Sequence, residues 1–156
     1  LIQTIPGLVM LGIALVFLGI GMFPALVVLT LYELLPILRN TYTGITEVDK
    51  SLIEAARGIG MTGAQILFKV ELPLALSSII SGIRISTVYI VSWATLAGLN
   101  GAGGLGDLIW TGLATYNSTY ILAGAIPSAI MALVFSGLIG IVKRLLTPRG
   151  LREVRV

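Results

Sequence analysis

Residues 108–142 read LIWTGLATYNSTYILAGAIPSAIMALVFSGLIGIV and contain no charged side chain. Two further stretches, residues 1–32 and 85–106, are uncharged as well. A helix that crosses a bilayer needs about 20 consecutive apolar residues, and each of these stretches is long enough to supply one. The sequence therefore predicts an all-α, polytopic membrane protein.

The composition of the whole chain supports this prediction. Of the 156 residues, 56% are hydrophobic and only 11% are charged, whereas a soluble domain carries about 25% charged residues. The absence of Cys and His from the sequence excludes disulfides, thiolate metal sites and His-based catalytic triads. We expect no cofactor and no catalytic site.

Glycine and proline residues divide the chain into four expected spans, at residues 5–20, 24–38, 74–96 and 119–146. Pro36 should kink the inner end of the second span. A charged loop is expected at 45–72, and a glycine-rich connector with a short helix near 107–114 is expected within 98–117. Leu1 is not a Met and begins no signal peptide, so we expect one domain, 1–156, that starts inside a longer chain.

The basic residues determine the expected orientation. Four lie within residues 39–73, five lie within 143–155, and none lies within 98–118. Since cytoplasmic segments of membrane proteins carry an excess of Lys and Arg, the 39–73 loop and the C-terminus should face the cytoplasm. Asn100 and Asn117 should then face outward.

The charged loop has helical structure of its own. Thr46-Glu47-Val48-Asp49 resembles a capping box, and an apolar helical face follows it up to Gly60. Thr62 and Gln65 form a second capping box, whose short helix should end at Pro73. The sequence thus predicts two capped helices joined at Gly60, which we call the elbow.

The elbow carries a resemblance to a known family. Glu54-Ala55-Ala56, then Gly60, then Val70-Glu71-Leu72-Pro73 resembles the EAA loop of ABC importer permeases. Residues 34–44 and 101–107 further resemble the permeases of osmoprotectant importers for glycine betaine, choline or carnitine. The resemblance covers the whole chain. It departs at Val70, where Ile is usual, and at Glu33, where the family's helix is generally apolar.

The resemblance implies the C-terminal part of a type I ABC importer permease core, lacking an N-terminal span, in a bacterial or archaeal cytoplasmic membrane. Such a permease forms the pathway for a small solute and pairs with a second permease copy or paralogue. Its other partners are two cytoplasmic ATP-binding subunits, an extracytoplasmic substrate-binding protein and membrane lipids, with no nucleic acid. The ATPase would be a separate subunit, since this sequence has no GxxxxGK[ST] motif. By the same resemblance, the residues that couple the permease to the ATPase are Glu54, Ala55, Ala56, Gly60, Leu72 and Pro73.

A second group of residues is a candidate for the pathway or its gate: Glu33, Arg84, Trp93, Asn100, Gly101, Gly103, Gly104, Gly106 and Asp107. Arg84 lies about ten residues into its span, where an unpaired charge is costly. It could pair with Glu33 of the neighbouring span. Alternatively, it could snorkel or close the cytoplasmic end of the pore.

Several patterns allow two interpretations. Trp93, Trp110, Tyr116 and Tyr120 indicate an aromatic belt at the outer membrane surface or, alternatively, a cation-π site for a quaternary ammonium group. Small residues recur every four positions at Ser78, Gly82 and Ser86 and at Ser128, Ala132, Ser136 and Gly140. They favour close helix packing within the subunit or against a second permease.

Three other functions are weighed against the importer permease. Residues 101–106 match GxGxxG, but the strand and the partner acid of a dinucleotide site are missing from the pattern. A small secondary transporter with broken helices is the main alternative, with residues 98–106 and Pro127 as its indicators. A membrane-embedded enzyme is weaker, since His and Cys are absent from the sequence.

Overall fold

The computed structural model describes residues 5–146, apart from the side chain of Asn100. The described residues form helices and turns without a strand, so the all-α prediction is confirmed. The elements in chain order are α1 Gly7–Leu18, α2 Met22–Thr46, α3 Lys50–Gly58, α4 Gly63–Ile66, a π turn Leu67–Glu71, α5 Leu72–Ala97, a 3-10 turn Gly98–Asn100, α6 Leu105–Ala114 and α7 Ser118–Leu146.

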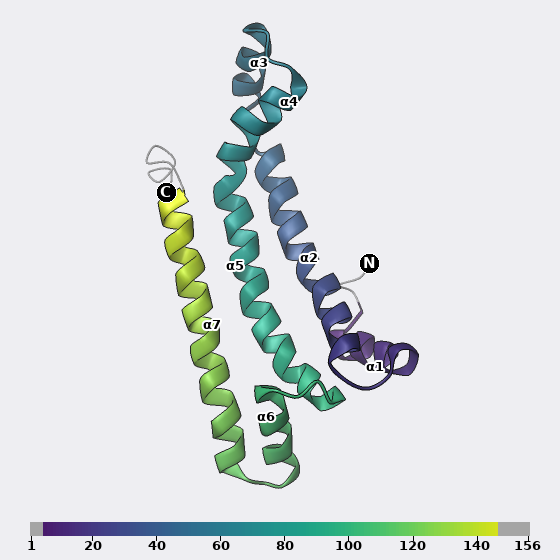
Figure 1. Ribbon diagram of the computed structural model, residues 1–156. Helices are drawn as coiled ribbons and strands as arrows, with labels where there is room; N and C mark the ends of the chain where they lie inside the picture. The colour runs from purple at the N-terminus through teal and green to yellow at the C-terminus, as the bar shows by residue number, and fades with distance from the viewer. Residues whose placement is uncertain (1–4, 147–156) are drawn as a thin grey trace.

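Three long helices, α2, α5 and α7, lie side by side with α5 in the middle (Figure 1). Within the described part of the chain, three helical segments are long and apolar enough to cross a membrane: Met22–Thr46, Gly63–Ala97 and Ser118–Leu146. The predicted span at 5–20 corresponds to α1, whose 12 residues lie across one end of α2. At about 1.5 Å per residue, α1 is shorter than the roughly 30 Å hydrocarbon core. The count of four spans therefore stays a prediction.

Helix α2 extends eight residues beyond the predicted end at residue 38 and continues to Thr46. The prediction was wrong because it took the appearance of charge at Arg39 as the end of the helix. Charge marks the place where a helix leaves the apolar environment, and the helix itself can continue. Pro36 lies inside α2, and Asn40 Nδ2 donates a hydrogen bond to the Pro36 carbonyl at 2.8 Å.

The short helix of the loop does not end at Pro73, which corrects a second prediction. A π turn connects α4 to α5, and all three form one helical segment of 35 residues, Gly63–Ala97. The Leu72 N–H donates to the Leu67 carbonyl, five residues back. Pro73 sits in the first turn of α5. The π turn widens the helix where a proline ring would otherwise clash with the preceding turn.

Glycines bring the helices close together at both ends of α5. A methyl group added to Gly44 of α2 would lie 2.6 Å from Ser78 Cβ of α5. At the other end, a Cβ on Gly106 would lie 2.3 Å from the Thr95 carbonyl oxygen. Glycine at these two positions lets α2 and α6 pack directly on the backbone or on small side chains of α5.

Candidate functional site

The elbow lies at one end of the molecule, beyond the ends of α2 and α5 (Figure 1). The side chain of Asp49 caps α3 and accepts a hydrogen bond from the Ser51 backbone N–H at 2.9 Å. Hydrogen bonds from the Ser51 backbone and hydroxyl lower the pKa of Asp49 below its ordinary value. The predicted cap at Thr46 is wrong. Its hydroxyl donates to the Tyr42 and Thr43 carbonyls and completes the last turn of α2.

The turn between α3 and α4 is determined by Gly60, whose φ of +83° is left-handed. The Gly60 N–H donates to the Arg57 carbonyl and the Met61 N–H donates to the Ala56 carbonyl. These two bonds form a Schellman motif, in which a left-handed glycine ends a helix. The predicted capping box of Thr62 and Gln65 is present with both of its hydrogen bonds. The elbow is therefore a built structure with both helix ends capped.

The structure places the EAA residues in two groups. On α3, Glu54 and Ala55 are exposed at the tip of the elbow, while Ala56 is buried. Leu72 and Pro73 lie in the first turn of α5, at the base of the elbow. A carboxylate and a small apolar side chain on α3 are thus available to a second protein.

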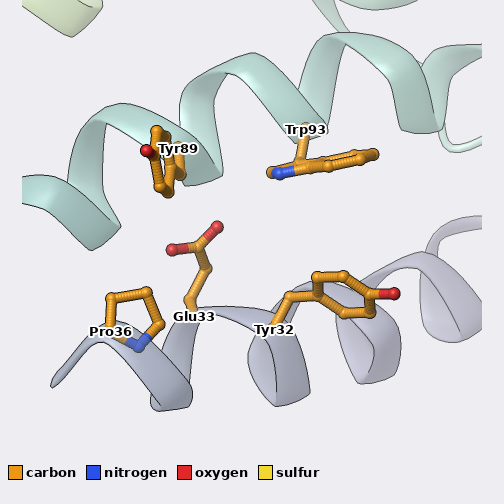
Figure 2. Close-up of a pocket in the computed structure, with 5 residues that line it drawn as sticks. All are labelled: Tyr32, Glu33, Pro36, Tyr89 and Trp93. Atoms are coloured by element: carbon orange, nitrogen blue, oxygen red, sulfur yellow. The ribbon is translucent and has the colours of Figure 1, made fainter. Parts of the chain in front are cut away.

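The second feature is a cavity of about 410 Å³ between α2 and α5. Tyr32, Glu33 and Pro36 of α2 face Tyr89 and Trp93 of α5 across it (Figure 2). We call this set the aromatic-carboxylate cavity. The rings of Tyr32 and Trp93 are in contact, with centroids 5.9 Å apart. Figure 2 shows the Glu33 carboxylate pointing into the space between α2 and α5.

Pairing with Glu33, the first of the alternatives for Arg84, is not what the structure shows. Ser86 Oγ, which lies between the two helices, donates to Glu33 Oε2 at 2.8 Å and lies 2.8 Å from the Glu33 carbonyl oxygen. Arg84 points toward α7 instead, where its Nε donates to Ser136 Oγ at 2.9 Å. Residues 84 and 86 of α5 are two positions apart, so their side chains leave the helix in different directions. Ser86 therefore faces Glu33 of α2, while Arg84 faces α7.

Arg84 helps to line a second cavity, of about 380 Å³, together with Ser81 and Lys143. Lys143 of α7 donates to Ser81 Oγ at 2.6 Å. The other predicted pathway residues lie at the connector between α5 and α6. Gly101, Gly103 and Gly104 adopt positive φ angles, and Asp107 is exposed in the first turn of α6.

The predicted pathway set therefore divides into three places rather than one. Only Glu33 and Trp93 share the aromatic-carboxylate cavity. The sequence interpretation missed Tyr32, Pro36, Tyr89 and Ser86 there. Tyr89 and Trp93 are spaced four apart, as are Tyr32 and Pro36, so each pair lies on one helix face. That spacing was the available signal, but it could not show that the two faces meet.

Comparison with known proteins agrees with this architecture. A family model for the binding-protein-dependent transport system inner membrane component matches residues 1–151. The carnitine transport permease protein OpuCB of Listeria monocytogenes is 51% identical over 99% of this chain and 71% of the relative. The choline transport system permease protein OpuBB of Bacillus subtilis is 49% identical over the same shares.

A solved structure shares the fold. An inward-facing structure of the MetNI methionine ABC transporter superposes with a TM-score of 0.82 and 29% identity. The superposition covers 94% of this chain and 71% of that chain. The family match covers nearly the whole length, the long helices are apolar, and osmoprotectant permeases are among the relatives. The chain therefore belongs to the inner membrane components of binding-protein-dependent transport systems, as a permease subunit of an ABC importer.

Proposed function

We propose that this permease imports quaternary ammonium osmoprotectants. The observation that carries the proposal is the naming of relatives at 47–51% identity as permeases for carnitine, choline, or glycine betaine, carnitine and choline. Two permease subunits, identical or paralogous, would enclose the pathway. A substrate-binding protein outside the membrane would deliver the solute, and two cytoplasmic ATPase subunits would hydrolyse ATP.

We propose further that the elbow couples the permease to the ATPase. This proposal is supported by the exposure of Glu54 and Ala55 in the middle of the capped helix α3. A short helix held by an Asp cap at one end and a Schellman motif at the other can move as a rigid unit. Because α4 continues through the π turn into α5, a displacement of the elbow would reach a membrane-spanning helix directly. The exposed EAA residues would form the contact with the ATPase, and Leu72 and Pro73 would mark the joint with α5.

The substrate class is tested by measuring solute uptake in cells that grow in high salt. A host that lacks its own osmoprotectant importers should receive the full permease with its ATPase and binding protein. Glycine betaine, choline and carnitine, each at micromolar concentration, should be compared with methionine and proline as solutes without a quaternary ammonium group. We expect uptake of at least one of the three quaternary ammonium compounds. Uptake of methionine or proline alone would contradict the proposed substrate class.

A further inference from the structure

We propose that the aromatic-carboxylate cavity is a binding site for the quaternary ammonium group of the solute within the membrane. The inference rests on the proposed function for the class of solute. It goes beyond that function by assigning a site on the permease itself, with Glu33 as the charged group. Tyr32, Tyr89 and Trp93 would form its aromatic walls.

The position of the Glu33 carboxylate favours a positively charged ligand. Glu33 lies on a membrane-spanning helix, and its side chain is only 6% exposed. A carboxylate at such a place is costly unless a counter-charge or several hydrogen bonds compensate it. Within residues 5–146, Glu33 forms no ion pair, and its carboxylate receives only the hydrogen bond from Ser86. The carboxylate therefore has room for a positive partner from outside the chain.

The Glu33 carboxylate can also be reached from the cavity. Ser86 occupies Oε2, and none of the described residues donates a hydrogen bond to Oε1. Among these residues, no fully buried side-chain oxygen or nitrogen lacks a partner. Oε1 is therefore not enclosed, and Figure 2 shows the carboxylate directed into the space toward Tyr89 and Trp93. A ligand in the cavity can reach it.

The walls of the cavity suit a quaternary ammonium group. Tyr32, Tyr89 and Trp93 present aromatic rings, and Pro36 adds an apolar surface. A quaternary ammonium group carries a permanent charge and has no N–H to donate, so aromatic faces and one carboxylate suit it better than a set of hydrogen-bond acceptors. A volume of about 410 Å³ falls within the range of about 300–1,000 Å³ of small-molecule sites.

A metal ion fits the cavity less well. Glu33 is its only acidic residue, and the described part of the chain holds no group of three or more acidic side chains that could bind a metal ion. Hard cations such as Mg²⁺ and Ca²⁺ prefer several oxygen ligands at fixed positions. An organic cation is the better match for one carboxylate among three rings.

The test compares choline with its neutral carbon isostere, 3,3-dimethylbutan-1-ol. The two probes have the same shape and differ in charge. Both should be titrated by saturation-transfer NMR onto the purified permease–ATPase complex in lipid nanodiscs, without the binding protein. We expect the wild-type complex to bind choline about tenfold more tightly than the isostere, because only choline is attracted by the carboxylate and the rings.

Three variants make the result specific. Glu33→Gln keeps the shape of the side chain, removes its charge, and should bring the two affinities to within about twofold of each other. Tyr89→Leu, at a half-exposed position, should weaken choline binding while leaving the isostere nearly unchanged. Glu47→Gln removes an exposed carboxylate at the cytoplasmic end of the same helix and should retain the wild-type preference.

The ratio of the two affinities remains informative if a variant is partly unfolded, because both probes report on the same folded fraction. Equal binding of the two probes by the wild type, or an unchanged preference in Glu33→Gln, would overturn the proposed site. The complete transporter in proteoliposomes separates this failure from a failure of the proposed function. If wild-type and Glu33→Gln transporters take up choline, glycine betaine and carnitine with the same rate and KM, the site is wrong and the function stands. If the wild type takes up none of the three, the proposed function is wrong as well.

Discussion

At the scale of single residues, two glycines determine how closely α2 and α5 approach. A Cβ on Gly82 would lie 2.8 Å from Asn40 Cβ and 3.1 Å from the Pro36 carbonyl oxygen. Gly44 faces Ser78 in the same way, and Ser86 bonds to Glu33 one step further along. The stripe Ser78, Gly82 and Ser86 of α5 therefore packs within the subunit, which is the first of the two interpretations of its spacing.

Gly82→Ala tests this packing. The added methyl group must displace Asn40 or the backbone near Pro36, and overpacking of this kind costs about 1–3 kcal/mol. We expect a lower midpoint of thermal unfolding for the purified permease in detergent. Gly137→Ala in α7 is the matched control, because a Cβ there meets nothing within 4 Å. The packing account is contradicted if both variants unfold at the wild-type temperature.

At the scale of elements, the sequence interpretation succeeded at two places where local chemistry decides the structure, although it misplaced the cap of α3 at Thr46 instead of Asp49. The turn at Gly60 and the capping box of Thr62 and Gln65 depend on residues within a few positions of one another, and both are present. It failed at Arg39, where it took the appearance of charge as the end of α2, and at Pro73, which it took as the end of the loop's short helix. Whether a helix continues past a proline depends on packing and on a π turn, and a local pattern of residues contains neither. For the same reason, a local pattern could not show whether Glu33 meets Arg84, because that depends on how α2, α5 and α7 are rotated relative to one another.

The elbow yields a prediction about Gly60. A β-branched residue in the left-handed conformation costs about 1–2 kcal/mol, so Gly60→Val should misdirect α4 relative to α3. The permease should still reach the membrane, while less ATPase subunit should be retained on the purified protein. Gly58→Val, two residues earlier and without a positive φ, is the control. Equal retention by both variants would show that the shape of the turn does not matter for the ATPase.

Charge on α3 yields a separate prediction. Glu54→Lys reverses one exposed charge without touching a buried contact. If α3 contacts the ATPase, retention of the ATPase and solute uptake should both fall several-fold, and the losses should depend on ionic strength. Glu47→Lys makes the same charge change at the end of α2 and should have a much smaller effect. Comparable losses from the two substitutions would indicate a general effect of charge on the loop rather than a contact at Glu54.

At the scale of the whole molecule, we propose an orientation in the membrane that would put the elbow beside the ATPase and the α6–α7 end outside. The elbow and the C-terminal end of α7 lie toward one end of the long helices, and the α6–α7 turn lies at the other (Figure 1). This agrees with the placement of basic residues along the chain. The sequence is free of cysteine, so Lys50→Cys and Asn117→Cys can be labelled one at a time. An impermeant maleimide applied to intact cells should label the second and not the first, and labelling of both from outside would refute the orientation.

The central claim is that this chain forms the pathway of an importer driven by ATP. Its most direct test is uptake of labelled glycine betaine, choline or carnitine into proteoliposomes that contain the permease and its ATPase. The account predicts accumulation only when ATP is present on the ATPase side and the binding protein on the other side, with several-fold lower accumulation in Glu54→Lys. Accumulation driven by a sodium or proton gradient without ATP would contradict it, and would favour the secondary transporter.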